Sequence, residues 1–265
     1  SYKQAMLEFG SDKPDLRNPL RIIDLTDFFQ RCTFKPFHGK TVRAIKVHAD
    51  MSKGFHEKLL KFAQSIGMGG LGYLEVMEDK SYKGPIDKFI PDDMKEEIRE
   101  TAGLEVGDTI FFIADNEKNA ALYAGQIRTA LGERLDLIEK NSFKFCYIND
   151  FPMYEYDKET KKMEFTHNPF SMPQGGLEAL ETMDPEEILA YQYDIVCNGV
   201  ELSSGAVRNH DMKIMVKAFE IAGYTEEDLK EKFGALYNAF QFGAPPHAGM
   251  APGVDRMIML LRDEE

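Results

Sequence analysis

An Asn-Gly pair between two apolar runs constrains the fold of this chain more than any other feature. Residues 191–208, YQYDIVCNGVELSSGAVR, carry β-branched and apolar residues on both sides of Asn198 and Gly199. Asn-Gly is the preferred centre of a two-residue hairpin turn, because both central residues must adopt positive φ. The sequence therefore predicts two antiparallel strands joined at this pair.

The turn also predicts which residues face each other. The expected pairs are Cys197 with Val200, Val196 with Glu201, Ile195 with Leu202, and Asp194 with Ser203. Asp194 and Glu201 would then lie on one face with Val196 and Ser203, roughly 7 to 8 Å apart at the backbone. That spacing suits a shared divalent cation.

Two buried carboxylates require a positive partner, because an unpaired buried charge is costly. A magnesium ion or the nearby Arg208 could supply it. The alternative is an exposed strand face whose carboxylates are solvated. The hairpin alone leaves both interpretations open.

Length and composition define the broad class of protein. A chain of 265 residues can form one large domain or a domain with an insert. The net charge of -13 argues against general affinity for a phosphate backbone, without excluding a local basic groove. No apolar run is long enough to cross a membrane, so we expect a soluble protein without a membrane partner. Ser1 in place of an initiator Met indicates a processed or engineered start.

The three cysteines, Cys32, Cys146 and Cys197, lie in unlike contexts. An odd number without ligand spacing favours reduced thiols in a cytoplasmic protein over disulfides or a zinc site.

The first half of the chain alternates short strands and helices. Strands are expected at residues 41–48, 72–77 and 109–114, and helices at 55–66, 92–101 and 120–131. This pattern predicts a compact α+β insert. The glycines of GMGGLG (67–72) match a dinucleotide fingerprint, but they follow a helix and precede a strand, so we interpret them as a connecting loop.

The second half predicts further sheet and helices. A strand is expected at 143–148, a hairpin within 154–165, and a helix at 211–222 capped by Asn209. A second helix begins at a Thr225–Asp228 capping box and ends before Gly243.

Two further residues are candidates for ligand binding. His167 lies in the Pro-bounded loop THNPFSMP, where it could contact a ligand or make only local hydrogen bonds. Arg256 lies in the first turn of a helix expected from Val254, after a short strand at 249–251. A cation near outward-pointing N–H groups favours phosphate, whereas the alternative is an ion pair with Asp255 or another surface acid.

Six segments in this order resemble the bacterial type of aspartyl-tRNA synthetase. They are GSDKPDLR, GDTIFFIADN, INDFPM, HNPFSMP, NGVELSSGAVR and GAPPHAGMAPGVDR. The last is similar to the third signature motif of class II synthetases. The resemblance implies an α+β fold, with part of the class II antiparallel sheet and its flanking helices carrying an α+β insertion domain. The expected boundaries are 1–24 and 139–265 for the catalytic domain and 25–138 for the insert.

The resemblance also implies an activity and roles for individual residues. Such an enzyme joins aspartate to ATP and passes the aspartyl group to tRNA, and it acts as a homodimer. His167 and Arg208 would bind aspartate, and Asp194 with Glu201 would hold Mg²⁺ on ATP. The remaining ATP-binding residues, besides Glu201, would be Gly253, Val254, Asp255 and Arg256.

The chain departs from the family pattern in two respects. Many relatives are expected to have His-His-Pro-Phe where this chain has His167 and Asn168. The anticodon-binding barrel and the first two class II motifs should precede residue 1, so we interpret the chain as a fragment. Such a fragment should expose sheet edges, self-associate and lack aspartate activation by itself.

Two rival interpretations remain. Residues 25–138 could be a tRNA-contacting or interdomain binding module without catalysis, although they show no arginine-rich stripe or aromatic platform. The chain could also come from a synthetase paralogue that makes a free amide or activates another amino acid.

Overall fold

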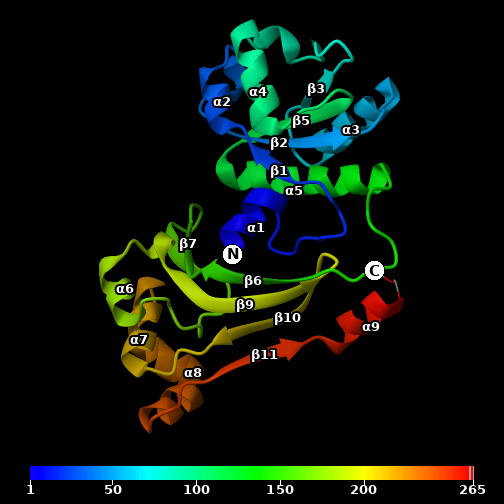
Figure 1. Cartoon of the computed structure of the whole chain (residues 1–265). Helices are drawn as coiled ribbons and strands as arrows, with labels where there is room; N and C mark the ends of the chain where they lie inside the picture. Colours follow the sequence, from blue (N-terminus) through cyan, green and yellow to red (C-terminus); the bar gives the residue numbers. More distant parts are fainter. Residues whose placement is uncertain (263, 265) are drawn as a thin grey trace. The chain divides into compact units, whose positions relative to one another are not determined.

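The computed structural model describes residues 1–262 and 264. The chain divides into two compact units. We call residues 4–144 the insertion unit, and residues 1–3 together with 145–265 the hairpin unit. The labels of Figure 1 are used for their helices and strands.

The insertion unit is built around an antiparallel sheet whose strands follow the order β1-β2-β5-β3-β4 (Figure 1). Its strands are β1 (Ile22–Asp24), β2 (Thr41–His48), β3 (Gly72–Val76), β4 (Tyr82–Lys83) and β5 (Asp108–Asp115). The helices are α1 (Tyr2–Phe9, from Gln4 onward), α2 (Thr26–Arg31), α3 (Lys53–Ser65), α4 (Lys95–Ala102) and α5 (Glu117–Arg134). Short 3₁₀ turns occur at Lys35–Phe37, Asp87–Phe89 and Asp92–Met94.

Both faces of this sheet are buried by helices. Successive residues of β5 alternate between two apolar cores, because side chains along a strand point to opposite faces. Ile110 and Phe112 pack on the side of α2 and α4. Phe111 and Ile113 pack on the side of α3 and α5. This explains the continuous apolar run in β5 and confirms the α+β character expected for the insert.

The observed boundaries of the insertion unit differ from the expected 25–138. Residues 4–24, expected in the catalytic domain, group with the insertion unit instead. Strand β1 pairs with β2, and a Cβ placed on Gly10 would lie 2.5 Å from the backbone nitrogen of Gly125 in α5. Residues 139–144 also group with this unit, and the hairpin unit resumes at Phe145. The pairing and the close packing are long-range contacts that sequence periodicity does not reveal.

A buried arginine fixes the loop before β1. The Arg128 side chain, on α5, donates from Nε to the Leu20 carbonyl at 2.7 Å and from Nη2 to the carbonyls of Asn18 at 2.8 Å and Asp15 at 2.9 Å. Burial, with a smaller contribution from Arg21, lowers the pKa of Arg128 to about 10. The side chain therefore stays protonated at neutral pH.

Replacing Arg128 with methionine is expected to lower the free energy of unfolding by about 3 to 5 kcal/mol. The substitution leaves three carbonyl acceptors in a buried site without their donor. Urea unfolding followed by circular dichroism measures the change. Arg134→Met, at an exposed position of the same helix, is the matched control and should change stability by less than about 1 kcal/mol. Equal effects of the two substitutions would contradict this role of Arg128.

The hairpin unit contains an antiparallel sheet in the order β11-β10-β9-β6 (Figure 1). Its strands are β6 (Phe145–Pro152), β9 (Leu189–Cys197), β10 (Val200–Val207) and β11 (Ala248–Pro252). A separate hairpin consists of β7 (Tyr154–Asp157) and β8 (Lys162–Phe165), as expected for this segment.

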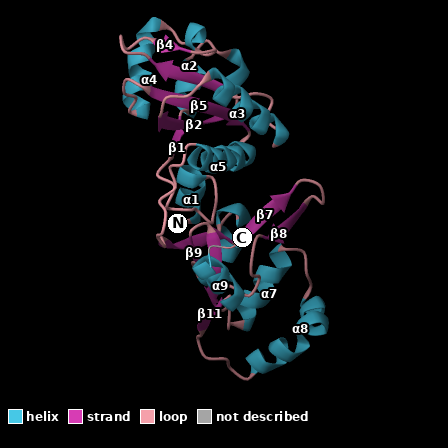
Figure 2. Ribbon diagram, turned by 90° about the vertical axis from the view of Figure 1, so that its right-hand side faces the viewer, coloured by secondary structure: helices cyan, strands magenta, loops and turns pink. Residues whose placement is uncertain are grey.

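Helices cover part of the hairpin unit. They are α6 (Gly176–Thr182), α7 (Met212–Ile221), α8 (Glu226–Gln241) and α9 (Val254–Arg262), with a 3₁₀ turn at Pro185–Glu187 (Figure 2). The core residues Met215 and Phe219 of α7 pack against Leu229 and Tyr237 of α8. The capping box at Thr225 is confirmed.

The expected cap of α7 is wrong. Asp211, not Asn209, caps the helix, and its side chain accepts hydrogen bonds from the backbone nitrogens of Lys213 and Ile214. Asn209 is buried, and its own backbone nitrogen donates to the Phe170 carbonyl at 2.8 Å. The cap thus lies two residues later than expected, and the helix itself begins at Met212, one residue after the expected start.

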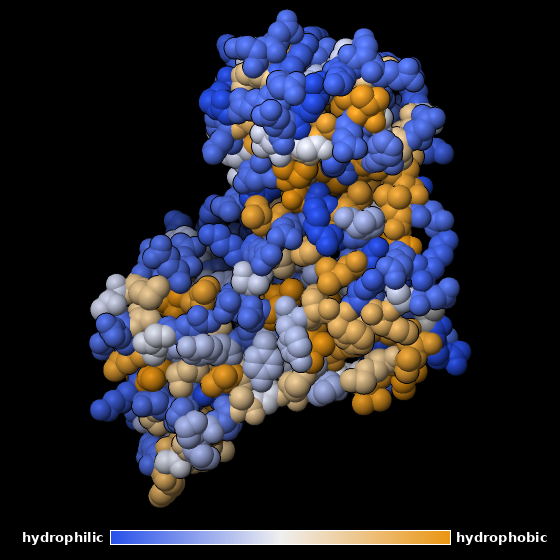
Figure 3. Space-filling model, in the orientation of Figure 1, coloured by the Kyte–Doolittle hydropathy of each residue, from blue (hydrophilic) through white to orange (hydrophobic). Residues whose placement is uncertain are grey.

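Apolar side chains are exposed where α9 lies. Val254, Ile258 and Leu261 are 66, 49 and 74% exposed, and their spacing places them along one face of the helix. Figure 3 shows apolar residues gathered over this end of the hairpin unit. Strand β11 is an edge strand and is exposed along its whole length, which agrees with the expectation of an open sheet edge. In the described part of the chain, no helix combines the length and apolarity needed to cross a bilayer.

Candidate functional site

The site is built on the β9–β10 hairpin. Asn198 and Gly199 have φ values of 51 and 85°, as the Asn-Gly turn requires. The expected pairs Cys197 with Val200 and Val196 with Glu201 are confirmed. The two later pairs are wrong, because a register shift between Glu201 and Ser203 leaves Leu202 as an extra residue. Ile195 therefore pairs with Ser203, and Asp194 with Ser204.

This β-bulge decides which side chains share a face. Glu201 and Arg208 are seven residues apart, so a regular strand would point them to opposite faces. The extra residue Leu202 shifts the alternation of side chains between the two faces by one position. Glu201 pairs with Val196 before the bulge, and Ala206 pairs with Gln192 after it. Glu201, Asp194 and Arg208 consequently belong to the same face of the hairpin, whereas Ser203 moves to the other.

The two carboxylates on this face differ in exposure. Asp194 is 3% exposed, and the Glu201 side chain is 24% exposed. Arg256 Nη1 donates to the Glu201 carbonyl at 2.7 Å and lies 3.3 Å from Glu201 Oε1. An ion pair this exposed contributes about 1 kcal/mol or less. The Arg256 guanidinium could therefore exchange Glu201 for a phosphate at little cost.

The remaining expected ATP-binding residues lie where β11 turns into α9. The Gly253 backbone nitrogen donates to the carbonyl of the bulge residue Leu202 at 2.8 Å, which fixes the start of the helix on β10. Val254 and Asp255 occupy the first turn of α9 and are exposed. Arg256 follows in the same turn and reaches back to Glu201.

Arg208 lies directly after β10, between two loops. Its backbone nitrogen donates to the His247 carbonyl at 2.9 Å, and it forms an isolated bridge with Ser171. Within residues 1–262 and 264, the half-buried guanidinium of Arg208 has no hydrogen-bond or ion-pair partner. A partly desolvated cation of this kind favours an anionic ligand.

His167 is the exposed residue of a half-buried loop that leads to Ser171. Its ring contacts Phe151 edge-on, with 4.7 Å between ring centroids, and Tyr2 at 6.3 Å. Asn168, at the position of the expected second histidine, accepts the backbone N–H of Phe170 at 2.9 Å. Asn168 therefore shapes the loop as an Asx turn.

Small residues leave space on the face between Glu201 and Arg208. Ser204 of β10 pairs with Ala251 of β11, and both are exposed. Gly249, on the same face, is exposed as well. The sequence alone does not distinguish these positions, and its one indication is the run of Ser and Gly in β10, because these residues are weak strand formers.

The donor set fits a magnesium ion that also binds a ligand. Carboxylate oxygens suit Mg²⁺, which commonly takes one or two carboxylates and completes its shell with water and phosphate oxygens. Asp194 and Glu201 supply two carboxylates on one face. Among the described residues no group of three or more His, Cys, Asp or Glu side chains could hold a metal, so a magnesium ion held by these two carboxylates would need further oxygen ligands from water or from a bound molecule.

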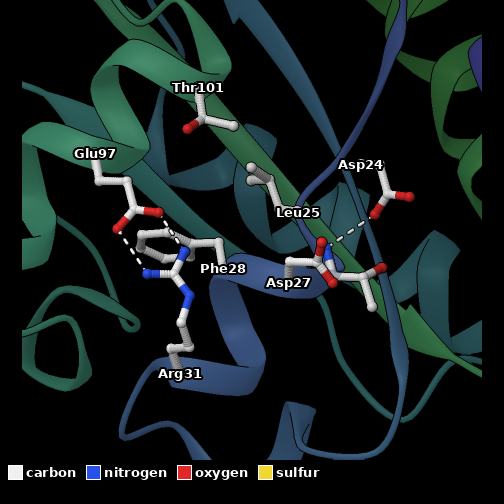
Figure 4. A pocket seen from close by; sticks show the side chains of 8 residues that line it. Asp24, Leu25, Asp27, Phe28, Arg31, Glu97 and Thr101 are labelled. Carbon is white, nitrogen blue, oxygen red and sulfur yellow. Dashed lines mark hydrogen bonds and ion pairs between the residues drawn. The ribbon is translucent and has the colours of Figure 1, made fainter.

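Of the cavities among the described residues, two that lie in the insertion unit are lined by none of the expected site residues. Figure 4 shows one of about 360 Å³, where Arg31 forms an ion pair with Glu97 opposite Asp24 and Asp27. A second, of about 730 Å³, is lined by His48, His56, Glu75, Lys83 and Asp108, among others. Carboxylates pair with the basic groups in both cavities. Neither cavity therefore favours binding of an RNA phosphate backbone.

Comparison with known proteins gives the family. Residues 1–265 match the family described as tRNA synthetases class II (D, K and N), and the chain belongs to this family. Among curated relatives, the aspartate–tRNA(Asp/Asn) ligase of Ehrlichia ruminantium (strain Gardel) is 54% identical over 270 residues, which cover 99% of this chain. The ligases of the same name from Gluconobacter oxydans and Rickettsia africae are 55% and 52% identical, over 99% of this chain.

The chain spans about half the length of the curated relatives it matches, 46% for the Ehrlichia ruminantium ligase and 45% for that of Gluconobacter oxydans. The solved aspartyl tRNA synthetase of Entamoeba histolytica aligns with a TM-score of 0.32 at 18% identity, covering 83% of this chain and 40% of that one. The family assignment therefore rests on the sequence relatives.

Proposed function

We propose that this protein is an aspartate–tRNA ligase, which activates aspartate with ATP and transfers the aspartyl group to tRNA. The observation that carries the proposal is the bulge at Leu202, which gives Glu201 and Arg208 a common face. Arg208, which can pair with a carboxylate, and Glu201, which can hold a metal ion on a phosphate, therefore lie on the same face. The names of the relatives support the same activity.

Arg208 and His167 would bind aspartate. The planar guanidinium of Arg208 matches the side-chain carboxylate of aspartate in a two-pronged hydrogen bond, which the amide of asparagine cannot reproduce. A site built around such a charged pair can reject the uncharged analogue by a factor on the order of 10⁴. Arg208 would therefore select the amino acid, and His167 would contact it from the loop.

ATP would lie along β10 and the start of α9. Arg256 would bind the terminal phosphate after releasing Glu201, and Gly253, Val254 and Asp255 would line the nucleotide site. Asp194 and Glu201 would hold Mg²⁺, which supplies neutralisation of the triphosphate charge when bound. The small residues Ser204 and Ala251 leave room for the nucleotide between these groups.

The chemistry requires no nucleophile from the protein. The α-carboxylate of aspartate attacks the α-phosphate of ATP, and pyrophosphate leaves with the electron pair of the broken P–O bond. The chain's own contribution is to align the two substrates and to stabilise charge with Arg256. Attack by a ribose hydroxyl of tRNA on the aspartyl adenylate then releases AMP.

Partners and location complete the proposal. The relatives are aspartate–tRNA(Asp/Asn) ligases, which supports the tRNAs for aspartate and for asparagine as acceptors. We include a homodimer and a cytoplasmic location in the proposal, because both are expected of the family.

Aspartate-dependent exchange of pyrophosphate into ATP tests this function. With the protein in the longest form in which it occurs, aspartate should support exchange, and asparagine or glutamate should support it at least about 10³-fold less well. Equal exchange with asparagine would contradict the role of Arg208, and absence of exchange with every amino acid would contradict the proposed function.

A further inference from the structure

A buried polar pair lies beneath the loop that carries His167. Gln192 of β9 is 5% exposed, and Ser171 is fully buried. Gln192 Oε1 accepts from Ser171 Oγ and lies within hydrogen-bond distance of the Asn168 backbone nitrogen, at 3.4 Å in both cases. One side-chain oxygen thus contacts both ends of the turn at residues 168–171.

The same segment is inserted between the diverging ends of β9 and β10. The Met172 nitrogen donates to the Val207 carbonyl at 2.8 Å, and the Tyr191 nitrogen donates to the Met172 carbonyl at 2.9 Å. Ser171 itself pairs with Arg208. The position of Ser171 therefore helps to set the position of the Arg208 backbone.

Gln192 is on the face of the hairpin that carries Arg208. It pairs with Ala206, two residues before Arg208, and it is two residues from Asp194. A glutamine on a buried strand face is costly unless its polar atoms are hydrogen-bonded. Among the residues that the structure describes, the Gln192 side-chain oxygen contacts only the loop at residues 168–171, and these hydrogen bonds offset the cost of burying it.

We propose that Gln192 is a positioning residue for aspartate, a proposal that rests on the proposed function. By joining Asn168 and Ser171 to β9, it holds the His167 loop and the Arg208 backbone in one arrangement. Gln192 does not itself touch aspartate or ATP. Its loss should weaken aspartate binding and leave ATP binding nearly unchanged, because Arg256 and Glu201 lie at the opposite end of β10.

The first variants to test are Gln192→Met and Ser171→Ala, in the longest form of the protein. Gln192→Met keeps the shape and removes the acceptor. It should raise the KM for aspartate about tenfold and change the KM for ATP less than about twofold. The double variant should show little more effect than Gln192→Met alone, because both substitutions remove the same hydrogen bond. Gln64→Met, at an exposed position of α3, is the matched control.

Amide hydrogen exchange gives a readout that does not depend on activity. Gln192→Met should speed exchange of the Asn168 and Ser171 amides about tenfold, and Gln64→Met should leave it unchanged.

Unchanged protection of these amides, or an unchanged KM for aspartate in an active variant, would overturn the role of Gln192 alone. A parallel rise of both KM values would also overturn it, since that result indicates a general structural defect. Absence of aspartate-dependent exchange in the unaltered protein would instead overturn the proposed function, and the positioning of aspartate with it.

Discussion

Replacing Arg208 with leucine is expected to reduce kcat/KM for aspartate in pyrophosphate exchange by about 10²- to 10⁴-fold. Removing one member of a desolvated charge pair costs about 3 to 5 kcal/mol, because the other charge is left without its partner. The substrate carboxylate would then have to lose its water without gaining the guanidinium. The loss should appear mainly in the KM for aspartate, because Arg208 contacts neither phosphate nor metal in the proposed site.

The matched control for Arg208 is Arg262→Leu. Arg262 is an exposed arginine of α9 that pairs with Glu264, so its replacement removes the same charge away from the proposed site. It should leave exchange within about twofold of the unaltered protein. Normal use of aspartate by Arg208→Leu would remove the basis for aspartate recognition and would favour a paralogue that activates another amino acid.

Inserting one valine between Ile195 and Val196 is expected to lower exchange on the order of 10³-fold or more. The inserted residue supplies a partner for Leu202, so the strands pair without a bulge. Asp194 and Arg208 would then point to the face opposite Glu201. Every functional side chain proposed here would remain in the sequence, but Glu201 would be separated from Arg208 and also from Asp194, the other proposed metal ligand.

Deletion of Leu202 distinguishes this effect from simple damage to the hairpin. The deletion also removes the bulge, but it leaves Glu201 and Arg208 six residues apart and so on one face. It costs the hydrogen bond from Gly253 to the Leu202 carbonyl, so a loss of about tenfold is expected. Circular dichroism should show that both variants fold. If the deletion were as inactive as the insertion, the shared face would not explain the activity.

Local patterns predicted most of the secondary structure. The Asn-Gly turn, the Thr225 capping box and the alternating apolar runs each depend on residues close in sequence. Strands β2, β5 and β11 and helix α9 were predicted close to their observed bounds. The family and its expected site residues came from segments that resemble a known enzyme, so they did not require knowledge of the register.

Long-range contacts explain what the sequence did not reveal. The bulge at Leu202 depends on the partner strand and on the Gly253 hydrogen bond, and a hairpin sequence read alone favours regular pairing. Residues 4–24 group with the insertion unit, and their contacts with it include the packing of Gly10 on Gly125 and the hydrogen bond from Arg128 to the Asn18 carbonyl. The cap of helix α7 is Asp211 and not the predicted Asn209, because the Asn209 backbone bonds to Phe170, far away in the sequence.

The candidate site was only partly accessible from the sequence for the same reason. Asp194, Glu201, Arg208 and Arg256 carry charge and were visible as candidates. Gln192 and Ser171 are unremarkable residue types, and only burial and pairing with the loop distinguish them. The small residue Ser204 is informative only once its exposure on the site face is known.

The close packing around Gly205 limits how the proposed substrate site could change. A Cβ at this position would lie 2.4 Å from the Tyr193 ring and 2.5 Å from the Gly249 carbonyl oxygen. The Tyr193 hydroxyl also donates to that oxygen at 3.1 Å. These contacts hold β9, β10 and β11 together on the face opposite the proposed ligand-binding side chains. The three strands therefore have little freedom to bend. Adaptation of the proposed site to a larger or smaller amino acid would have to occur in the bordering loops, while the three strands kept their arrangement.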